Sequence, residues 1–420
     1  MRIRFATYPG RATRLLLSAA VLGAGFMASG CGSSDRDDVA RGSTLTIYTS
    51  LPRHGLSARD AEAVAAGERM ALADAHGRAG GHRLRLVELD DSDPQKAGIW
   101  DPSAVERNAK QAAKDPSTIA YIGELDYGGS AISVPVTNAK AILQVSPGDG
   151  LTSLTQVQPG GFKTSPARYY PNGRRTFVRI VPTDLGESSE LMRWVRERGT
   201  ARVAIVHDDE LFGREMSAQA VAAAPSQRVS VAEVEEARAD EKSYADLARK
   251  IASKDPEAVV YFGLGGPQAG LVFRQLAAAL PGIPLYGSSG LVGDRATTAG
   301  VPPVELLDPT LPESAYGQAG KRVLARLERQ LGGTVSPRAL YGYEAMRLAI
   351  DAIDRAGRRS DDRSAVSAAA FAPGVRRSAI GAYAIQRTGD VAPVRFGAYR
   401  LYRGGLYFEG ARPAPPARRR

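Results

Sequence analysis

Histidine and cysteine, the side chains that most often serve as bases, nucleophiles and zinc ligands, are scarce in this chain of 420 residues. The four histidines include no pair at the i, i+4 spacing that places two zinc ligands on one face of a helix, and the only cysteine is Cys31. The acids Asp90, Asp91 and Asp93 lack the register and the terminal glutamate of a calcium-binding loop, so we interpret them as a turn-forming cluster. We therefore expect no metal ion.

Two glycine-containing segments resemble catalytic or cofactor-binding loops only in part. Gly287-Ser288-Ser289-Gly290 is followed by Leu291 where a nucleophile elbow needs its last glycine. Gly263-Leu264-Gly265-Gly266-Pro267-Gln268 lacks the third glycine of a dinucleotide-binding loop, and the sequence contains no P-loop. His207 follows an apolar run and is interpreted as structural. The sequence therefore predicts neither an enzyme nor a cofactor.

Cys31 stands at the end of a segment that has the features of an export signal. Four arginines (Arg2, Arg4, Arg11 and Arg14) precede an apolar run over residues 15–27, which is shorter than the roughly 20 residues that a membrane-spanning helix needs. Small residues at 28–30 then lead into Cys31, as in the lipobox of bacterial lipoproteins, although Ala28 stands where the lipobox prefers leucine. The alternative is a secretory signal followed by a chance cysteine. Both readings place the protein outside the cytoplasm, and the first anchors it to the cell membrane through a lipid on Cys31.

The formal net charge of +10 is concentrated at the two ends of the chain. Four arginines lie in the signal segment, and four more lie among the last nine residues. The body between them is nearly neutral, which argues against binding to nucleic acid. Hydrophobic residues make up 43% of the chain, enough for a sizeable core, and the chain is long enough for two lobes. A lone cysteine permits no disulfide within the chain.

Short apolar runs alternate with amphipathic stretches along the body, which predicts strands alternating with helices. Strands are predicted at 45–49, 84–89, 119–122, 141–145, 177–181, 203–206, 229–234, 258–262 and 285–286. Helices are predicted at 61–75, from Ser103 with Glu106 as a capping box, and at 130–140, 187–198, 214–224, 243–253 and 269–279. This alternation predicts an α/β fold with two doubly wound parallel sheets, whose ligands bind beyond the carboxyl ends of the strands.

Several segments, in this order, resemble the type I periplasmic binding proteins, in particular the branched-chain amino-acid group of ABC-transporter receptors. They are Asp90-Asp91-Ser92-Asp93-Pro94, Tyr121-Ile122-Gly123-Glu124 with Gly128-Gly129-Ser130-Ala131, Gln144-Val145-Ser146-Pro147, Val203-Ala204-Ile205-Val206-His207-Asp208 with Phe212-Gly213, Tyr261-Phe262-Gly263, Tyr286-Gly287-Ser288 and Tyr341-Gly342-Tyr343-Glu344-Ala345. The resemblance covers roughly residues 44–410.

The resemblance implies two lobes that are joined by three chain crossings and close on a ligand like a clam shell. The crossings would lie near residues 178–182, 306–309 and 379–382. The chain would then divide into a signal peptide (1–30), a flexible tether (31–43), a first lobe (44–180 and 308–380), a second lobe (181–307 and 381–410) and a disordered basic tail (411–420).

The resemblance also implies a ligand site in the cleft between the lobes. Gly129, Ser130 and Ala131 would begin a helix whose free N–H groups hold a ligand carboxylate, with Gly148, Asp149 and Thr152 in the next loop. Phe212, Leu264 and Ser289 would contact the ligand from the second lobe, and Tyr127 and Leu51 would lie near the cleft. Trp100 is expected to anchor its own loop rather than to contact the ligand.

Two positions depart from the family pattern. Gly150 falls where a threonine is common, and Thr152 is a candidate substitute. Ser289 lies near the place of a glutamate that faces the ligand ammonium. Either Asp126, Asp149 or another acid neutralises that charge here, or the ligand is not a simple α-amino acid, because an unpaired buried ammonium is costly.

The resemblance implies a monomeric, lipid-anchored receptor that captures a small polar ligand, an amino acid or a related compound, and delivers it to an ABC permease. A sensor that reports ligand binding to a signalling partner is the first alternative. A lipoprotein that uses the same lobe pair for protein interactions, without binding a small molecule, is the second.

Overall fold

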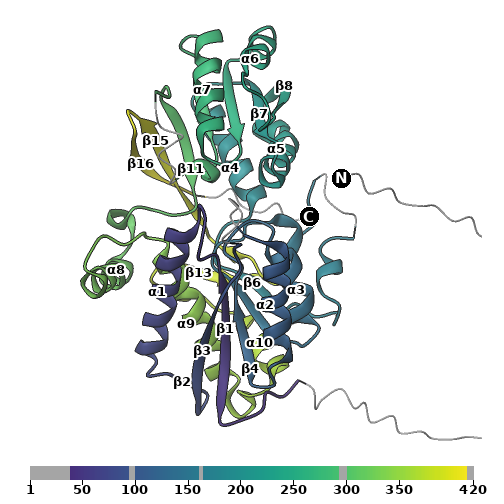
Figure 1. Cartoon of the computed structure of the whole chain (residues 1–420), viewed down its shortest axis with the longest axis vertical. Helices are drawn as coiled ribbons and strands as arrows, with labels where there is room; N and C mark the ends of the chain where they lie inside the picture. Colours follow the sequence, from purple (N-terminus) through teal and green to yellow (C-terminus); the bar gives the residue numbers. More distant parts are fainter. Residues whose placement is uncertain (1–37, 94–99, 160–163, 293–299, 414–420) are drawn as a thin grey trace, which may run out of the picture. The chain divides into compact units, whose positions relative to one another are not determined.

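The computed structural model describes residues 38–93, 100–159, 164–292 and 300–413 (Figure 1). Cys31, the predicted signal peptide and the last seven residues of the tail lie outside these ranges. The segment 38–43 belonged to the expected tether, but it packs against the body. Val39 forms a β-bridge with Asp362, and the buried Ala40 donates its backbone N–H to Asp361.

The first sheet has six strands in the order β2-β3-β1-β4-β5-β6. All neighbours are parallel except the antiparallel pair β2–β3. Helices α1, α9 and α10 pack on one face, and α2 packs on the other. The elements are β1 (Thr44–Leu51), β2 (Arg78–Ala79), β3 (His82–Asp90), β4 (Thr118–Ile122), β5 (Leu143–Ser146), β6 (Phe177–Arg179), α1 (Ala58–Asp74), α2 (Pro102–Lys114), α3 (Ser130–Asn138), α9 (Ala339–Arg355) and α10 (Arg363–Ala370).

The second sheet has seven strands in the order β16-β15-β11-β10-β9-β7-β8. Its β7–β11 part is parallel, while β15 and β16 add an antiparallel hairpin beside β11. Helices α4 and α5 pack on one face, and α6 and α7 pack on the other. The elements are β7 (Arg202–Asp208), β8 (Ser230–Ala237), β9 (Ala258–Phe262), β10 (Leu285–Gly287), β11 (Val304–Asp308), β15 (Arg395–Tyr402), β16 (Gly405–Pro413), α4 (Asp184–Glu197), α5 (Leu211–Ala223), α6 (Ala245–Ala252) and α7 (Pro267–Ala279).

Apart from short 3-10 helices, the other helix and strands of the described residues are α8 (Gln318–Leu331) and a small three-stranded sheet of β12 (Arg376–Ser378), β13 (Gly381–Ile385) and β14 (Val391–Ala392). Tyr383 and Val391 of this small sheet belong to the same hydrophobic cluster as Ile47 and Val145 of the first sheet. The chain therefore leaves the first core for β15 near residues 393–395, later than the expected third crossing at 379–382.

Both predicted doubly wound sheets are present, so the α/β fold with two lobes is confirmed. The predicted strand at 177–181 is β6, which forms the edge of the first sheet. The capping box at Ser103 was wrong. Asp101 is the N-cap of α2, because its carboxylate accepts the N–H groups of Ser103 and Ala104, and Pro102 supplies the first helical residue.

Candidate functional site

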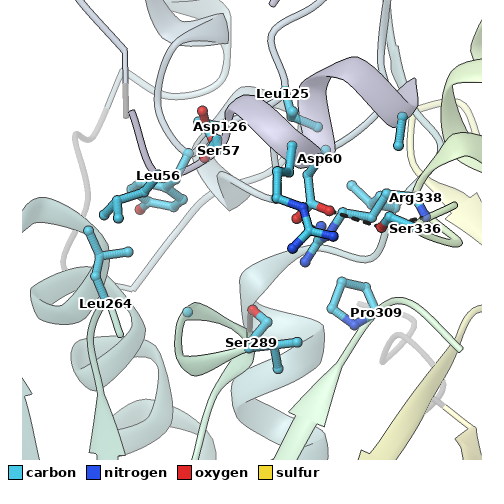
Figure 2. A pocket seen from close by; sticks show the side chains of 18 of the residues that line it. Leu56, Ser57, Asp60, Leu125, Asp126, Leu264, Ser289, Pro309, Ser336 and Arg338 are labelled. Carbon is cyan, nitrogen blue, oxygen red and sulfur yellow. Dashed lines mark hydrogen bonds and ion pairs between the residues drawn. The ribbon is translucent and has the colours of Figure 1, made fainter. Parts of the chain in front are cut away.

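A cavity of about 990 Å³ lies where the carboxyl ends of strands from both sheets face each other. The chain segments after β6 and β11, which run from one sheet to the other, also form its wall through Val181, Pro182 and Pro309. Figure 2 shows Ser57 and Asp126 on one wall, and Leu264 and Ser289 on the opposite wall. In open α/β folds, ligands bind at this edge of the sheets.

Helix α4 supplies two buried acids to the cavity. Thr183 caps the helix by accepting the N–H of Gly186, and Asp184 and Glu187 follow in its first turn. Their exposed fractions are only 6% and 3%. The positive end of the helix dipole stabilises acidic side chains in the first turn, which partly explains why Asp184 and Glu187 lie there. Burial nevertheless raises the pKa of Asp184 well above its ordinary value, and raises that of Glu187 to about 7.

The two acids differ in their hydrogen-bond partners. The Glu187 carboxylate accepts the backbone N–H of Ser289 at 2.7 Å and the Ser289 hydroxyl at 2.9 Å. Asp184 Oδ2 is buried without a partner among the described residues. Glu187 is the charged group that influences Asp184 most, and the other charged groups that act on these two carboxylates are Asp149, Arg179, Glu215, Asp308 and Arg338.

Asp126 contributes a third acid from the loop between β4 and α3. One of its oxygens accepts the Ser57 hydroxyl at 2.8 Å, and Oδ2 is buried with no partner in the described part of the chain. Burial raises its pKa to about 7, and the charged groups that act on it are Asp60, Asp91 and Arg338. Asp126, Asp184 and Glu187 therefore line the same cavity, and the first two each have an oxygen without a partner among the described residues.

Arg338 is a partly buried cation of this site, and its charge is already compensated. Its guanidinium lies 3.0 Å from Asp60 and 3.2 Å from Asp308, and these two carboxylates raise its pKa against the effect of burial. Asp60 of α1 and Arg338 at the start of α9 lie near each other because the two helices cross closely. A Cβ on Gly67 of α1 would lie only 2.0 Å from the Ala339 carbonyl oxygen of α9. Figure 2 shows Arg338 beside Asp60.

Aromatic side chains form another part of the wall. Tyr127 and Phe212 meet edge to face with their ring centroids 5.3 Å apart, and Trp100 also lines the cavity. The Tyr127 hydroxyl donates to Glu215, which also accepts from Gln158 at 2.6 Å. Trp100 was expected only to anchor its own loop, so its place in this wall is an addition.

Four residues of the predicted site line the cavity, namely Gly148, Phe212, Leu264 and Ser289, and Tyr127 does so as well. Gly129, Ser130, Ala131, Asp149, Thr152 and Leu51 are not among the lining residues. Ser130 is fully buried, and its hydroxyl oxygen accepts the N–H of Glu124. Thr152 donates to Gln219 and accepts the N–H of Leu185.

Asp149 caps a helix and does not line the cavity. It was a candidate to neutralise a ligand ammonium, with capping as the alternative, and its side chain is fully buried. Its carboxylate accepts backbone N–H groups from Gly128 at 3.2 Å, Ser130 at 2.9 Å and Leu151 at 3.0 Å. The start of α3 is thus capped by an acid of the protein itself.

Sequence reasoning missed Asp60, Asp184, Glu187 and Arg338, which all line the cavity. A signal for two of them was present, because Thr183 followed by acids one and four residues later is typical of a helix start directly after a predicted crossing. No comparable signal marked Arg338, whose place depends on how α9 packs on α1.

The described residues contain no group of three or more His, Cys, Asp or Glu side chains arranged to hold a metal ion. Within the same ranges, no helix is both long and apolar enough to cross a membrane.

The sequence is similar to those of known proteins over most of its length. A family described as periplasmic binding protein matches residues 44–393. A Leu/Ile/Val-binding protein homolog from Brucella abortus is 23% identical over 358 residues, which cover 84% of this chain and 90% of the relative.

Solved structures show the same fold. A leucine-binding protein from Thermotoga maritima has a TM-score of 0.71 and 19% identity, covering 88% of this chain and 98% of its own. A solute-binding protein of an ABC transporter from R. palustris, solved with benzoate, has a TM-score of 0.69 and 18% identity, covering 89% and 97%.

Proposed function

Since the chain belongs to the periplasmic binding protein family, whose members bind solutes outside the cytoplasm rather than catalyse reactions, we propose that it is the solute receptor of an ABC importer. It would bind a small polar organic ligand, an amino acid or a related compound, in the cavity between its two lobes, and present it as a monomer to a permease. A lipid on Cys31 would anchor it to the cell membrane.

One observation carries this proposal. The cavity is lined by the carboxyl ends of strands from both sheets, and it combines buried charged groups with an aromatic wall. Receptor sites for small molecules have this composition, with an apolar surface for the body of the ligand and few polar groups that fix its orientation. The names of the relatives agree, since they include proteins described as binding leucine or solved with benzoate.

The mechanism would be binding followed by closure of the lobes around the crossings. A ligand that contacts both walls stabilises the closed state by the difference in its affinity for the two states. We retain the two lobes, but extend the first lobe to about residue 392 and place the third crossing at residues 393–395, because β13 and β14 pack with the first core. The proposed ligand contacts are those predicted residues that line the cavity, together with Asp126, Asp184, Glu187 and Arg338.

A thermal-shift screen tests the receptor function. The panel would contain amino acids, amines, amides, urea-like compounds, short peptides and aromatic acids. A ligand at 100 times its Kd should stabilise the protein by about 2.7 kcal/mol and raise the Tm by a few degrees. If no compound of this panel raises the Tm, the receptor function is contradicted.

Substitution of the cysteine tests the anchor separately. Cys31→Ser removes the thiol that would carry the lipid, so the variant should move from the membrane fraction to the soluble fraction of the cell envelope. Unchanged fractionation of this variant would exclude a lipid anchor at this position.

A further inference from the structure

We propose that the cavity selects a small organic cation without a carboxylate, an amine with an apolar or aromatic body, and holds its charge with Asp126, Asp184 and Glu187. This inference rests on the proposed receptor function and specifies the ligand of the same site. It depends on which hydrogen-bond donors and charged groups around the cavity are already paired within the protein.

The position at which a ligand carboxylate was expected is filled by the protein itself. The N–H groups of Gly128 and Ser130 at the start of α3 both donate to Asp149, and the Ser130 hydroxyl is fully buried against Glu124. These donors are therefore not available to an anionic group of a ligand. A carboxylate brought to this loop would instead find these N–H groups occupied by the Asp149 carboxylate, on which the buried Arg179 also acts.

The carboxylate of Asp184 is a second acid in this region after Asp149, and it fits there because Gly150 has no side chain. A Cβ on Gly150 would lie only 2.1 Å from Asp184 Oδ1, so this acid occupies the space that a side chain at position 150 would fill. Asp184 lines the cavity, is more than nine-tenths buried, and keeps Oδ2 without a partner in the described structure. A buried carboxylate oxygen without a donor is costly, and a ligand N–H group would satisfy it.

Glu187 lies one helical turn further along α4, so it shares a face of the helix with Asp184. Its two hydrogen bonds to Ser289 fix its carboxylate at the strand end from which the second sheet faces the cavity. The acid missing at position 289 is thus supplied from α4. Asp126 adds, from the first-sheet side of the cavity, an oxygen that has no partner in the part of the chain that the structure describes.

The cations of the cavity wall do not balance these acids. Arg338 is held by Asp60 and Asp308, and Arg59, the other arginine of the wall, is exposed. Acids outnumber arginines among the described lining residues, which are Asp60, Glu62, Asp126, Asp184, Glu187 and Glu210 against Arg59 and Arg338. Asp60 and Glu62 are already paired with arginines, so the acids that carry the argument are Asp126, Asp184 and Glu187. Such a wall favours a cation, and it opposes an anion or the carboxylate of a zwitterion.

The apolar part of the wall fits the body of such an amine. The faces and edges of Trp100, Tyr127 and Phe212 can pack on an aromatic or branched aliphatic group, and aromatic rings also attract a cation that lies over their faces. The Tyr127 hydroxyl already donates to Glu215, and the negative ring faces repel a carboxylate. The sign of the ligand charge therefore follows from the acids, and the rings set its shape.

Two sets of matched compounds test the inference by calorimetry with the full chain. One set is leucine, isoamylamine and 4-methylpentanoate, and the other is phenylalanine, 2-phenylethylamine and 3-phenylpropanoate. Within each set the body is the same while the charged groups differ. We expect at least one amine to bind at least tenfold more tightly than its amino acid, and neither carboxylate to bind.

Tighter binding of an amino acid or a carboxylate than of its matched amine would overturn the inference while supporting the receptor function. If neither set binds but another neutral or anionic compound of the wider panel does, the inference is again overturned and the receptor function stands. Binding of no compound at all would contradict both. An amine that binds best fulfils both.

Variants of α4 show whether the acids hold the cation. Asp184→Asn and Glu187→Gln should each weaken binding of the amine at least tenfold. Glu190→Gln is the matched control, because Glu190 is a buried acid on the same helix that pairs with Arg193 and Arg412 instead of lining the cavity. The control should keep the Kd of the parent protein.

A melting curve for each variant separates lost binding from lost folding, and Asp126→Asn on the opposite side provides an independent variant if one α4 substitution prevents folding. An unchanged Kd in those acid variants that fold would contradict the inference. A loss in Glu190→Gln as large as in Glu187→Gln would also contradict it, since the effect would then not depend on facing the cavity.

Discussion

The contact between Gly150 and Asp184 gives the most direct test of how this cavity is built. In the Gly150→Ala variant, the new Cβ would lie 2.1 Å from Asp184 Oδ1 and 3.0 Å from its Cγ. Neither backbone can easily move away, because the N–H of Asp184 donates to the carbonyl oxygen of Gly150 at 2.9 Å. The overlap must be relieved by displacing the carboxylate, whose surroundings are buried.

The expected loss of stability follows from this overlap. Forcing one extra carbon into a well-packed site typically costs about 1–3 kcal/mol. The backbone of Gly150 does not have a positive φ, so alanine is not strained there for conformational reasons. When Asp184 is first replaced by alanine, the same Gly150→Ala change should be neutral, or stabilising by up to about 1 kcal/mol through the unfolded state.

A double-mutant cycle measures this difference. Urea unfolding of the parent protein, of each single variant and of Gly150→Ala with Asp184→Ala should give a coupling free energy of about 1–3 kcal/mol. Gly333→Ala serves as a control substitution, because a Cβ at that position would have no other atom within 4 Å and the φ of Gly333 is not positive. If the changes in unfolding free energy caused by the two single substitutions simply add in the double variant, Asp184 does not occupy the space beside Gly150. The preference of this cavity for a cation would then lose its basis.

Three further outcomes are expected. Burial raises the pKa of Glu68 to about 8, so the folded protein binds a proton here that the unfolded chain releases. The parent should lose stability as the pH rises from about 5 to 8, by at most about 1.4 kcal/mol per pH unit. Glu68→Gln should therefore gain stability relative to the parent over this range in urea unfolding, and a difference that stays constant with pH would refute this. Because the pKa values of Asp126 and Glu187 are raised to about 7, a cation should bind more tightly at pH 8 than at pH 6 and release protons, which calorimetry in buffers of different ionisation enthalpy detects; equal affinity at both pH values would contradict their role. Arg179→Met should destabilise the fold by about 3–5 kcal/mol in denaturant unfolding, because it leaves the buried Asp390 unpaired, and a loss below about 1 kcal/mol would show that this ion pair contributes little.

Much of the fold could be predicted because its strands are short apolar runs between strong breaks. The run over β9 (Ala258–Phe262) is fully buried and follows Pro256, and the amphipathic α6 precedes it. In such a chain the alternation itself implies a parallel sheet with both faces covered. The hairpin of β15 and β16 was not predicted as strands. Four consecutive residues of β15 are buried, β16 is mostly exposed, and the hairpin joins an otherwise parallel sheet at its edge.

The site was less predictable than the fold, for a geometric reason. The strand ends that carry Gly148, Leu264 and Ser289 reach the cavity because parallel strands end at one edge of a sheet. Asp184 and Arg338, in contrast, lie at helix starts whose direction depends on how the chain crosses between the lobes and on how two helices pack. These features depend on contacts between residues distant in sequence, and no local pattern specifies them.

The loop after β5 shows how two neighbouring residues can set the polarity of a receptor. Asp149 supplies the negative charge that the start of α3 favours, so a ligand has no need to bring one. Gly150 leaves room for Asp184, which places a second carboxylate where a longer side chain would exclude it. Neither residue shows this role by itself in the sequence. There, Asp149 resembles an acid that is free to pair with a ligand, and Gly150 only lacks the threonine that is common at its position. Their meaning appears only when the donors of α3 and the first turn of α4 are placed beside them, and it is the pairing of these two changes that makes a cation the better complement of the cavity.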